Sequence, residues 1–573
     1  MNCRWIAAGL AVLMLSACAT TRAPDSDVPA SERLPAAEAP ETAPATDPDV
    51  MYHVMAGEVQ GHAGDFEKSS AEYLAAALES EDPAIARRAT QVAISSESWL
   101  YASMAADRWV LLQPDSLDAR QTAIQVMLLN GDYVAAEYQM SELLDIMGDE
   151  QSRAWSIITA QLANAGDPER AGNILAHLIS THEAAGNADA LFARSQLAAR
   201  SGDMQDAFAL AEQALETEPG RAELHAWAGR LAVNLRFDDV AFARYERANQ
   251  LKPHDRTIAS AYAELLRRKD RLDEALRVLE NLPDSPEVRF GRVGFALSSD
   301  LVGEAEAIYR GFYTRSYPDA RTAAFQAARA AEMLGYDQEA IDWYAQVKSG
   351  DRALVAVLRR AVLLAENDDL EGGRNLLAQT RVRRDPSVQL ETYLTESQIL
   401  TQAGQGEEAW QVLTQALDVM PGHPDVLYGR ALLSVELGRI DEAEQDLRQI
   451  LEEDPRNAAV LNALGYTLAD LTNRFDEAEQ LIRAALDLQP EEASILDSMG
   501  WVAYRQGRHE EALAYLEQAW IRDNNPEIAA HLGEVLWVLG REEDAKSAWR
   551  LGLERGPDDP VLKATISRFG AEL

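Results

Sequence analysis

The sequence predicts an all-α protein made of one two-helix motif that is repeated along the chain. Two observations support this prediction. Ala, Leu, Glu, Gln and Arg dominate and runs of β-branched residues are scarce, so intrinsic preference favours helix almost everywhere. A small residue also recurs about every 34 positions, with glycine, large apolar residues and proline at fixed offsets from it. A hydrophobic content of 47% in 573 residues is ample for a buried core.

The first residues have the pattern of an export signal. Arg4 supplies a positive start, and the apolar run from Trp5 to Leu15 is too short to span a bilayer. We therefore expect residues 1–17 to be a cleaved signal peptide. The four residues that end at Cys18, Leu-Ser-Ala-Cys, resemble the lipobox of bacterial lipoproteins, which implies that Cys18 carries the lipid. The alternative is an ordinary secretory signal with an incidental cysteine.

Residues 18–49 are predicted to form a disordered tether behind the lipidated Cys18. Prolines are spaced through acidic and small residues, and the segment has too little apolar surface to offset the entropy lost on folding. Prolines bias such a chain toward extended conformations of about 3.1 Å per residue, so the tether can reach on the order of 100 Å. Stable membrane attachment requires more than one acyl chain on the cysteine. This lipid anchor is the only membrane contact that we expect.

Fifteen small residues, here called anchors, mark the repeat at intervals of 30 to 36 residues. They are Ser69, Ala102, Ala136, Ala171, Ala207, Ala241, Ala275, Ala305, Ala340, Gly373, Ala409, Ala443, Ala478, Ala512 and Ala545. The shortest interval contains Pro283 and Pro286, which suggests a shortened repeat or a bend. We therefore divide the repeats into an N-terminal arm, 50–285, and a C-terminal arm, 286–573.

Each residue at a fixed offset from the anchor has a physical role. Glycine five places before it permits a left-handed turn, a large apolar residue four places after it fills the neighbouring hole, and proline twelve places after it ends the second helix. In the C-terminal arm these are Gly404, Gly438, Gly507 and Gly540, then Leu413, Leu447, Leu516 and Trp549, then Pro421, Pro455, Pro490 and Pro557. This pattern resembles the tetratricopeptide repeat. The resemblance implies a right-handed superhelix of about 14–15 antiparallel helix pairs.

In a tetratricopeptide superhelix the first helices of successive repeats line a concave groove. Residues at helical spacing on these helices are then expected to face the groove, and aromatic side chains concentrate binding energy at interfaces. We therefore expect a partner-binding groove formed by Tyr428, Asn462, Tyr466, Asp497, Trp501, Tyr504, Glu534 and Trp537. The alternative is that Trp501 and Trp537 pack between neighbouring repeats as part of the core.

Charge and motifs exclude several functions. A formal net charge of −41 argues against nucleic-acid binding, which requires clustered Lys and Arg. The nine histidines are scattered, and the only two cysteines are Cys3 and Cys18, so we expect no metal and no cofactor. The sequence also has no nucleophile elbow, and we predict neither catalysis nor a small-molecule substrate. A cell-wall enzyme with an unrecognised site is the remote alternative.

The lipobox, the acidic tether, the number of repeats and the segment 496–519 together resemble a family of large outer-membrane lipoproteins that partner the periplasmic carboxy-terminal processing protease (LbcA-type). The resemblance implies an adaptor that binds and activates this serine protease and presents peptidoglycan hydrolases to it. It also implies a location on the periplasmic face of the outer membrane, and Ala19 and Thr20 behind the cysteine agree with that membrane. A scaffold for outer-membrane protein insertion, pilus assembly or secretion is the alternative.

Overall fold

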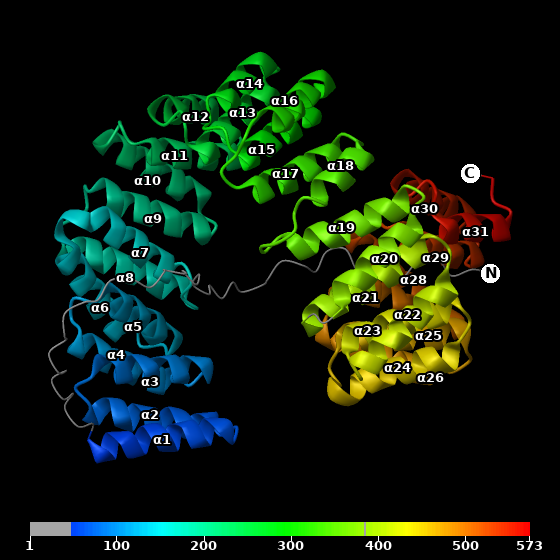
Figure 1. Ribbon diagram of the computed structural model, residues 1–573, viewed down its shortest axis with the longest axis horizontal. Helices are drawn as coiled ribbons and strands as arrows, with labels where there is room; N and C mark the ends of the chain where they lie inside the picture. Colours follow the sequence, from blue (N-terminus) through cyan, green and yellow to red (C-terminus); the bar gives the residue numbers. More distant parts are fainter. Residues whose placement is uncertain (1–46, 383–384, 573) are drawn as a thin grey trace, which may run out of the picture. The chain divides into compact units, whose positions relative to one another are not determined.

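The computed structural model describes residues 47–382 and 385–572 as a succession of α-helices (Figure 1). Within these residues there are 31 α-helices and no strand, so the predicted all-α class is confirmed. A short 3-10 helix, Gly148–Glu150, follows α6. The predicted signal peptide 1–17, the lipidated Cys18 and nearly all of the tether lie outside the described residues; the first helix begins at Pro48.

The helices that lie wholly or mainly in residues 47–302 are α1 Pro48–His62, α2 Phe66–Glu79, α3 Pro83–Ser95, α4 Trp99–Leu112, α5 Leu117–Leu129, α6 Tyr133–Met147, α7 Gln151–Leu162, α8 Pro168–Thr181, α9 Ala188–Arg200, α10 Met204–Thr217, α11 Ala222–Asn234, α12 Asp238–Leu251, α13 Arg256–Arg268, α14 Leu272–Glu280 and α15 Pro286–Ser298. The remaining helices are α16 Val302–Thr314, α17 Ala320–Met333, α18 Asp337–Tyr344, α19 Ala353–Glu366, α20 Leu370–Arg381, α21 Pro386–Gln402, α22 Gly406–Val419, α23 Pro424–Glu436, α24 Ile440–Glu453, α25 Ala458–Leu471, α26 Phe475–Leu488, α27 Ala493–Arg505, α28 His509–Arg522, α29 Pro526–Val538, α30 Glu542–Arg555 and α31 Pro560–Phe569.

Successive helices pair as the first and second helix of a repeat, from α1 and α2 to α29 and α30, and α31 follows the last pair. Every anchor is the fourth residue of the second helix in its repeat; Ala512, for example, is the fourth residue of α28. This position faces the first helix of the pair and is buried in all fifteen repeats. The predicted number of helix pairs is therefore confirmed for the described part of the chain.

Two compact units divide the chain between Val302 and Gly303. The predicted division into arms after residue 285 stays a prediction. The short interval between the anchors Ala275 and Ala305 has a local cause: α14 has 9 residues, whereas most second helices have 14. Pro286 then begins α15, with Ser285 as a capping residue that accepts a hydrogen bond from the N–H of Val288.

The two helices of a repeat approach closely at the anchor. In the repeat of α27 and α28, Gly500 lies against the anchor, and a Cβ atom added to it would be 2.6 Å from Cγ of Leu516 and 3.1 Å from the carbonyl oxygen of Ala512. Leu516 and the other large residues four places after their anchors are fully buried. Small residues at the contact therefore set the distance between the helices, and the large residue fills the space beside it.

The turns between paired helices use the left-handed backbone conformation that the glycines predicted. Gly404, Gly438, Gly507 and Gly540 have φ between +74° and +80°. Each predicted proline lies one or two residues beyond the end of its second helix, as Pro490 does after α26. In other repeats a residue with a side chain takes the same conformation, as Asp270 and Asp368 do, although the left-handed region is unfavourable for such residues.

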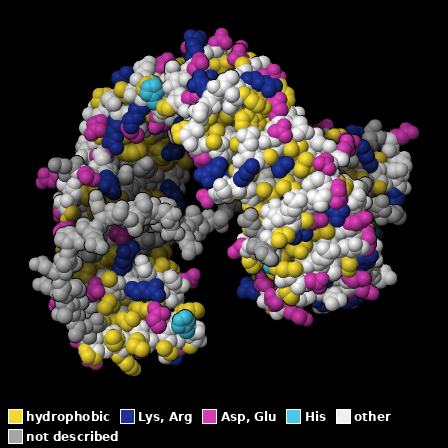
Figure 2. All heavy atoms as spheres, in the orientation of Figure 1, with side chains coloured by type: hydrophobic (Ala, Val, Ile, Leu, Met, Phe, Trp, Pro, Cys, Tyr) yellow, Lys and Arg dark blue, Asp and Glu magenta, His cyan; other side chains and the backbone are white. Residues whose placement is uncertain are grey.

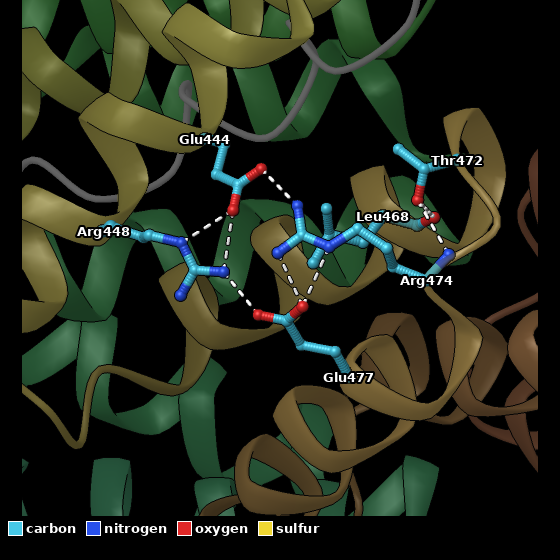
Figure 3. A network of polar contacts seen from close by, with 6 residues as sticks. All are labelled: Glu444, Arg448, Leu468, Thr472, Arg474 and Glu477. Carbon is cyan, nitrogen blue, oxygen red and sulfur yellow. Dashed lines mark hydrogen bonds and ion pairs between the residues drawn. The ribbon is translucent and has the colours of Figure 1, made fainter.

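The turn between α25 and α26 contains no glycine and is stabilised by polar contacts instead (Figure 3). Thr472 ends α25 in an extended conformation, donates its hydroxyl to the carbonyl of Leu468 at 2.6 Å and accepts the backbone N–H of Arg474 at 3.1 Å. Figure 3 shows Arg474 between two carboxylates: it lies 2.6 Å from Glu444 of α24 and 2.6 Å from Glu477 of α26. Arg474 therefore links the second helices of two successive repeats.

Alanine at Gly500 is expected to destabilise the C-terminal repeats by about 1–3 kcal/mol, because its Cβ would overlap Leu516 and press on the Ala512 carbonyl. The matched control is Gly172→Ala in α8, where nothing lies within 4 Å of the added Cβ. That substitution should leave stability unchanged or raise it by about 0.5–1 kcal/mol through the lost freedom of the unfolded chain. Urea unfolding followed by circular dichroism measures both changes, and equal effects would contradict the close approach.

Substitution Arg474→Gln is expected to destabilise the protein by about 0.5 kcal/mol at neutral pH and low salt, because the carboxylates that it joins are partly exposed. Arg474 lowers the pKa of Glu444, and Arg448 lowers the pKa of Glu477, from an ordinary value of 4.5. A carboxylate whose pKa is lowered on folding contributes stability that is present above its ordinary pKa of 4.5 and is lost as the pH falls below it. The difference between wild type and variant in urea unfolding should therefore shrink on acidification and in concentrated salt; a constant difference would contradict the ionic origin.

Candidate functional site

The first helices of the last repeats form one continuous face. The helices α25, α27, α29 and α31 contact one another in order, each next to the first helix of the following repeat. All eight residues predicted for the groove lie on first helices: one on α23, two on α25, three on α27 and two on α29. The structure therefore places the predicted residues on the same type of helix in four successive repeats.

These eight side chains differ in exposure. Trp501 is 7% exposed, Asp497 is 5% exposed and Glu534 is 4% exposed, so all three are buried. The other five are half-buried: Tyr428, Asn462, Tyr466, Tyr504 and Trp537. Partner binding by these eight residues stays a prediction. Only the five half-buried side chains expose surface that a partner can contact.

A buried ion pair joins α27 to α29. Nδ1 of His531 lies 2.9 and 3.0 Å from the two carboxylate oxygens of Asp497, and both side chains are almost fully buried. The ring of Trp501 stacks on the imidazole with 4.2 Å between ring centroids and 24° between ring planes. Trp501 therefore contributes to the packing between repeats, which is the alternative that the sequence left open for it.

The charges around His531 decide its protonation. Burial disfavours the imidazolium, but the adjacent Asp497, followed by Glu527 and Glu534, outweighs burial and raises the pKa of His531 to about 9. Burial also raises the pKa of Glu527 to about 7. The imidazolium is therefore the main form of His531 at neutral pH, and its charge is balanced by Asp497.

Two further carboxylates on this face tie aromatic residues to neighbouring repeats. Tyr504 donates its hydroxyl to Glu534 at 3.0 Å, and Arg568 of α31 also donates to Glu534. Asp470 of α25 accepts the indole N–H of Trp501 at 3.1 Å. These contacts hold the first helices in a single register from α25 to α31.

Trp537 and Tyr428, the last and the first of the eight predicted groove residues along the chain, have different surroundings. Trp537 stacks on Trp549 at 5.6 Å between ring centroids and lies 6.0 Å from Phe569, so its ring belongs to the apolar end of the repeats. At the other end, burial raises the pKa of Tyr428, which keeps its hydroxyl protonated. Oδ1 of Asn462 is buried and has no hydrogen-bond partner among the described residues. The rest of the Asn462 side chain is half-buried.

The sequence alone does not single out His531, which is one of nine scattered histidines. Its signal is the spacing of Glu527, His531 and Glu534, which places three polar side chains on one face of the otherwise apolar α29. Their contacts with α25 and α27 come from residues thirty or more positions away. Such contacts depend on how far one repeat is shifted relative to the next. The spacing of residues within one helix does not reveal that shift.

Comparison with known proteins decides the family. The family profile described as the tetratricopeptide repeat (TPR) matches residues 400–465, 435–499 and 503–568. A TPR repeat-containing protein of Pseudomonas aeruginosa, PA4667, is 32% identical over 569 residues, which cover 98% of this chain and 95% of that protein. The chain belongs to the family of TPR proteins.

Two solved TPR structures are also similar to parts of this TPR chain. A thermophilic TPR protein of Thermus thermophilus is 23% identical, with 32% of this chain and 99% of that chain covered and a TM-score of 0.29. A tetratricopeptide repeat protein of Parabacteroides merdae is 15% identical, with 44% of this chain and 99% of that chain covered and a TM-score of 0.37.

TPR repeats form scaffolds for contacts between proteins and are generally not catalytic. In the described residues of this TPR protein, no group of three or more His, Cys, Asp or Glu side chains could hold a metal ion. A search of the same residues finds no helix with the length and apolar character needed to cross a bilayer. Buried charges stiffen the first-helix face, and protein binding by it stays a prediction.

Substitution His531→Gln in this TPR protein is expected to destabilise the C-terminal repeats by about 3–5 kcal/mol, because it leaves Asp497 buried and unpaired. The raised pKa of His531 means that its stabilising contribution is fully present below pH 6.5 and is lost as the pH rises through about 9. The thermal midpoint of the wild type should therefore fall over this range, and that of the variant should fall less.

The control for this prediction is His254→Gln, which changes an exposed histidine in the loop between α12 and α13 and should preserve the wild-type pH dependence. Asp497→Asn provides a second test, because it removes the main group that raises the pKa of His531. Equal pH dependence in all four proteins would contradict the role given to the pair.

Proposed function

We propose that this protein is an outer-membrane-anchored periplasmic adaptor that binds and activates a carboxy-terminal processing protease. In this proposal the lipid on Cys18 holds the chain at the membrane, and the tether up to residue 49 gives the repeats their reach. The first-helix face gathers the protease and its peptidoglycan hydrolase substrates. Holding both on one molecule raises their effective concentration, so the adaptor accelerates cleavage without contributing a catalytic group.

The observation that carries the proposal is the continuous first-helix face of the C-terminal repeats. Its half-buried Tyr428, Tyr466 and Tyr504 offer rigid aromatic surface, and Asn462 is a half-buried polar residue among them. Aromatic side chains with a few polar groups between them are typical of surfaces that bind peptide segments. The full-length similarity to another TPR repeat-containing protein agrees with an interaction scaffold as the general role.

Reconstitution tests the adaptor role directly. The purified chain is mixed with the processing protease and a peptidoglycan hydrolase, and cleavage of the hydrolase is followed over time. We expect cleavage to accelerate when the chain is added. Unchanged cleavage would exclude the protease-adaptor function and favour a scaffold for another envelope assembly. Peptidoglycan fragments released by the chain alone would instead support the enzyme alternative.

A substitution on the first-helix face tests the proposed surface. Asn462→Ala removes a half-buried polar side chain from the first-helix face, and we expect it to weaken capture of the protease or the hydrolase about tenfold, the equivalent of about 1.4 kcal/mol. The matched control is Gln480→Ala, which changes an exposed amide on α26, the second helix of the same repeat. Equal loss in both variants, or capture unchanged by Asn462→Ala, would contradict the assignment of this face.

A further inference from the structure

An exposed hydrophobic face runs along two second helices of the N-terminal repeats. In α4, Leu100, Met104 and Leu111 are 59%, 44% and 68% exposed, and in α6, Val134 and Tyr138 are 81% and 60% exposed. Four residues of α4 are exposed, and three of them are these hydrophobic residues. We call the five residues the α4–α6 face. The two helices belong to successive repeats and both pack against α5 (Figure 1).

The other repeats provide an internal comparison for this face. Two places before the anchor, α4 and α6 have Leu100 and Val134, whereas the other thirteen second helices have an acidic residue, Gln or Gly. Two places after the anchor, they have Met104 and Tyr138, whereas the others have Ala, Asn, Gln, Ser, Asp or Arg. The α4–α6 face is therefore a local departure from the repeat and not a property of its geometry.

This departure removes a stabilising feature. Every second helix in the described part of the chain has an acidic residue in its first turn, except α4 and α6. An acidic residue there interacts favourably with the helix dipole and with free backbone N–H groups. Helix α6 keeps only its capping residue Asp132, which accepts the N–H of Ala135, and α4 has no side-chain cap. Both helices place large apolar side chains in water, as expected of a surface that another molecule covers.

The end of a repeat array also exposes apolar residues, and α1 shows this effect. Met51, Met55 and Val59 lie on one side of α1, where no earlier repeat packs among the described residues. Figure 2 shows hydrophobic side chains gathered at this end of the chain. That explanation does not apply to α4 and α6, because they lie between other repeats and their buried sides are already packed.

The charges around the α4–α6 face define what can cover it. Helix α6 has three carboxylates, Glu137, Glu142 and Asp145, and neither Lys nor Arg. Helix α4 has Asp107 and Arg108, and the guanidinium of Arg108 is engaged with backbone carbonyls of α2. Glu137 contacts His177 and Asp145 lies 3.6 Å from His182, but among the described residues neither Glu142 nor Asp107 has an ion pair, so the carboxylates outnumber the basic groups at the rim of the face.

This acidic rim disfavours two occupants. A second copy of the chain would bring the same carboxylates, and two molecules of net charge −41 repel each other. An anionic membrane surface would be repelled in the same way. A helix with an apolar side and flanking Lys or Arg residues complements both the hydrophobic residues and the rim, because two adjacent ridges of side chains accept the ridge of a third helix.

We propose that the α4–α6 face is a second docking surface, and that it binds an amphipathic helix of a partner protein whose apolar side is flanked by Lys and Arg. The surface lies on second helices, apart from the first-helix face of the proposed function. It does not depend on which protein that first-helix face binds. Leu100, Met104 and Leu111 form one wall of the site, and Val134 and Tyr138 form the other.

The test uses an 18-residue synthetic helical peptide with Leu on one side and Lys on the other, labelled for fluorescence anisotropy, and the full chain. The double variant Leu100→Glu/Val134→Glu should weaken peptide binding at least about tenfold relative to the wild type. Both residues are mostly exposed, so the fold is expected to persist, and circular dichroism checks this. The control is Ile521→Glu on α28, which places one glutamate at a residue 78% exposed and should change binding less than about twofold.

Several outcomes would overturn the proposal. Wild-type affinity in the double variant, or an equal loss in the Ile521→Glu control, would show that the peptide does not use the α4–α6 face. Equal binding of a peptide with Glu in place of Lys would contradict the basic flank. Sedimentation velocity in which the double variant abolishes self-association would assign the face to a second copy, and loss of co-sedimentation with anionic phosphatidylglycerol vesicles would assign it to a membrane.

Discussion

The structure depends on the close approach of two helices in every repeat. A small residue at the fourth position of the second helix lets the backbones approach, and most closely where a glycine lies opposite, as Gly500 lies opposite Ala512. The large residue one turn later, such as Leu516, then fills the remaining space. Because the same contact recurs along the chain, each repeat buries its apolar side against its neighbours, and the outward sides of the helices are free to vary. That freedom produces the two surfaces proposed for binding.

The first-helix face of the C-terminal repeats combines stiffness with limited exposure. A charge buried without a partner is costly, so α27 and α29 can meet only in the register that pairs Asp497 with His531. Trp501 covers that pair, and Glu534 joins Tyr504 to α31. Such a surface is held in place before a partner arrives, which lowers the entropy lost on binding. The α4–α6 face differs, because its side chains are exposed and separate acidic residues surround it.

Most of the fold could be predicted from the sequence because it follows from local spacing. The anchors predicted the second helices, and glycines such as Gly507 predicted the left-handed turns. The turn at Thr472 was not predicted, because its hydroxyl and the ion pairs of Arg474 replace glycine by contacts that span two repeats.

The candidate site was predictable only in part. Its residues lie on the expected helices, but the burial of Trp501 depends on stacking against His531, thirty residues later. The offset between α27 and α29 determines that contact, and it arises from the packing of whole repeats. Both the sequence and the structure were required to identify the α4–α6 face. The repeat pattern in the sequence marks Leu100 and Val134 as unusual, and the structure shows that they are exposed.

The central claim is that the first helices of the C-terminal repeats hold another protein. Hydrogen–deuterium exchange of the full chain, alone and with a catalytically inactive processing protease, tests it most directly. The account predicts slower exchange in α25, α27 and α29 on binding, with α26 and α28 little changed. Slower exchange confined to the second helices, or none anywhere in residues 458–538, would contradict it.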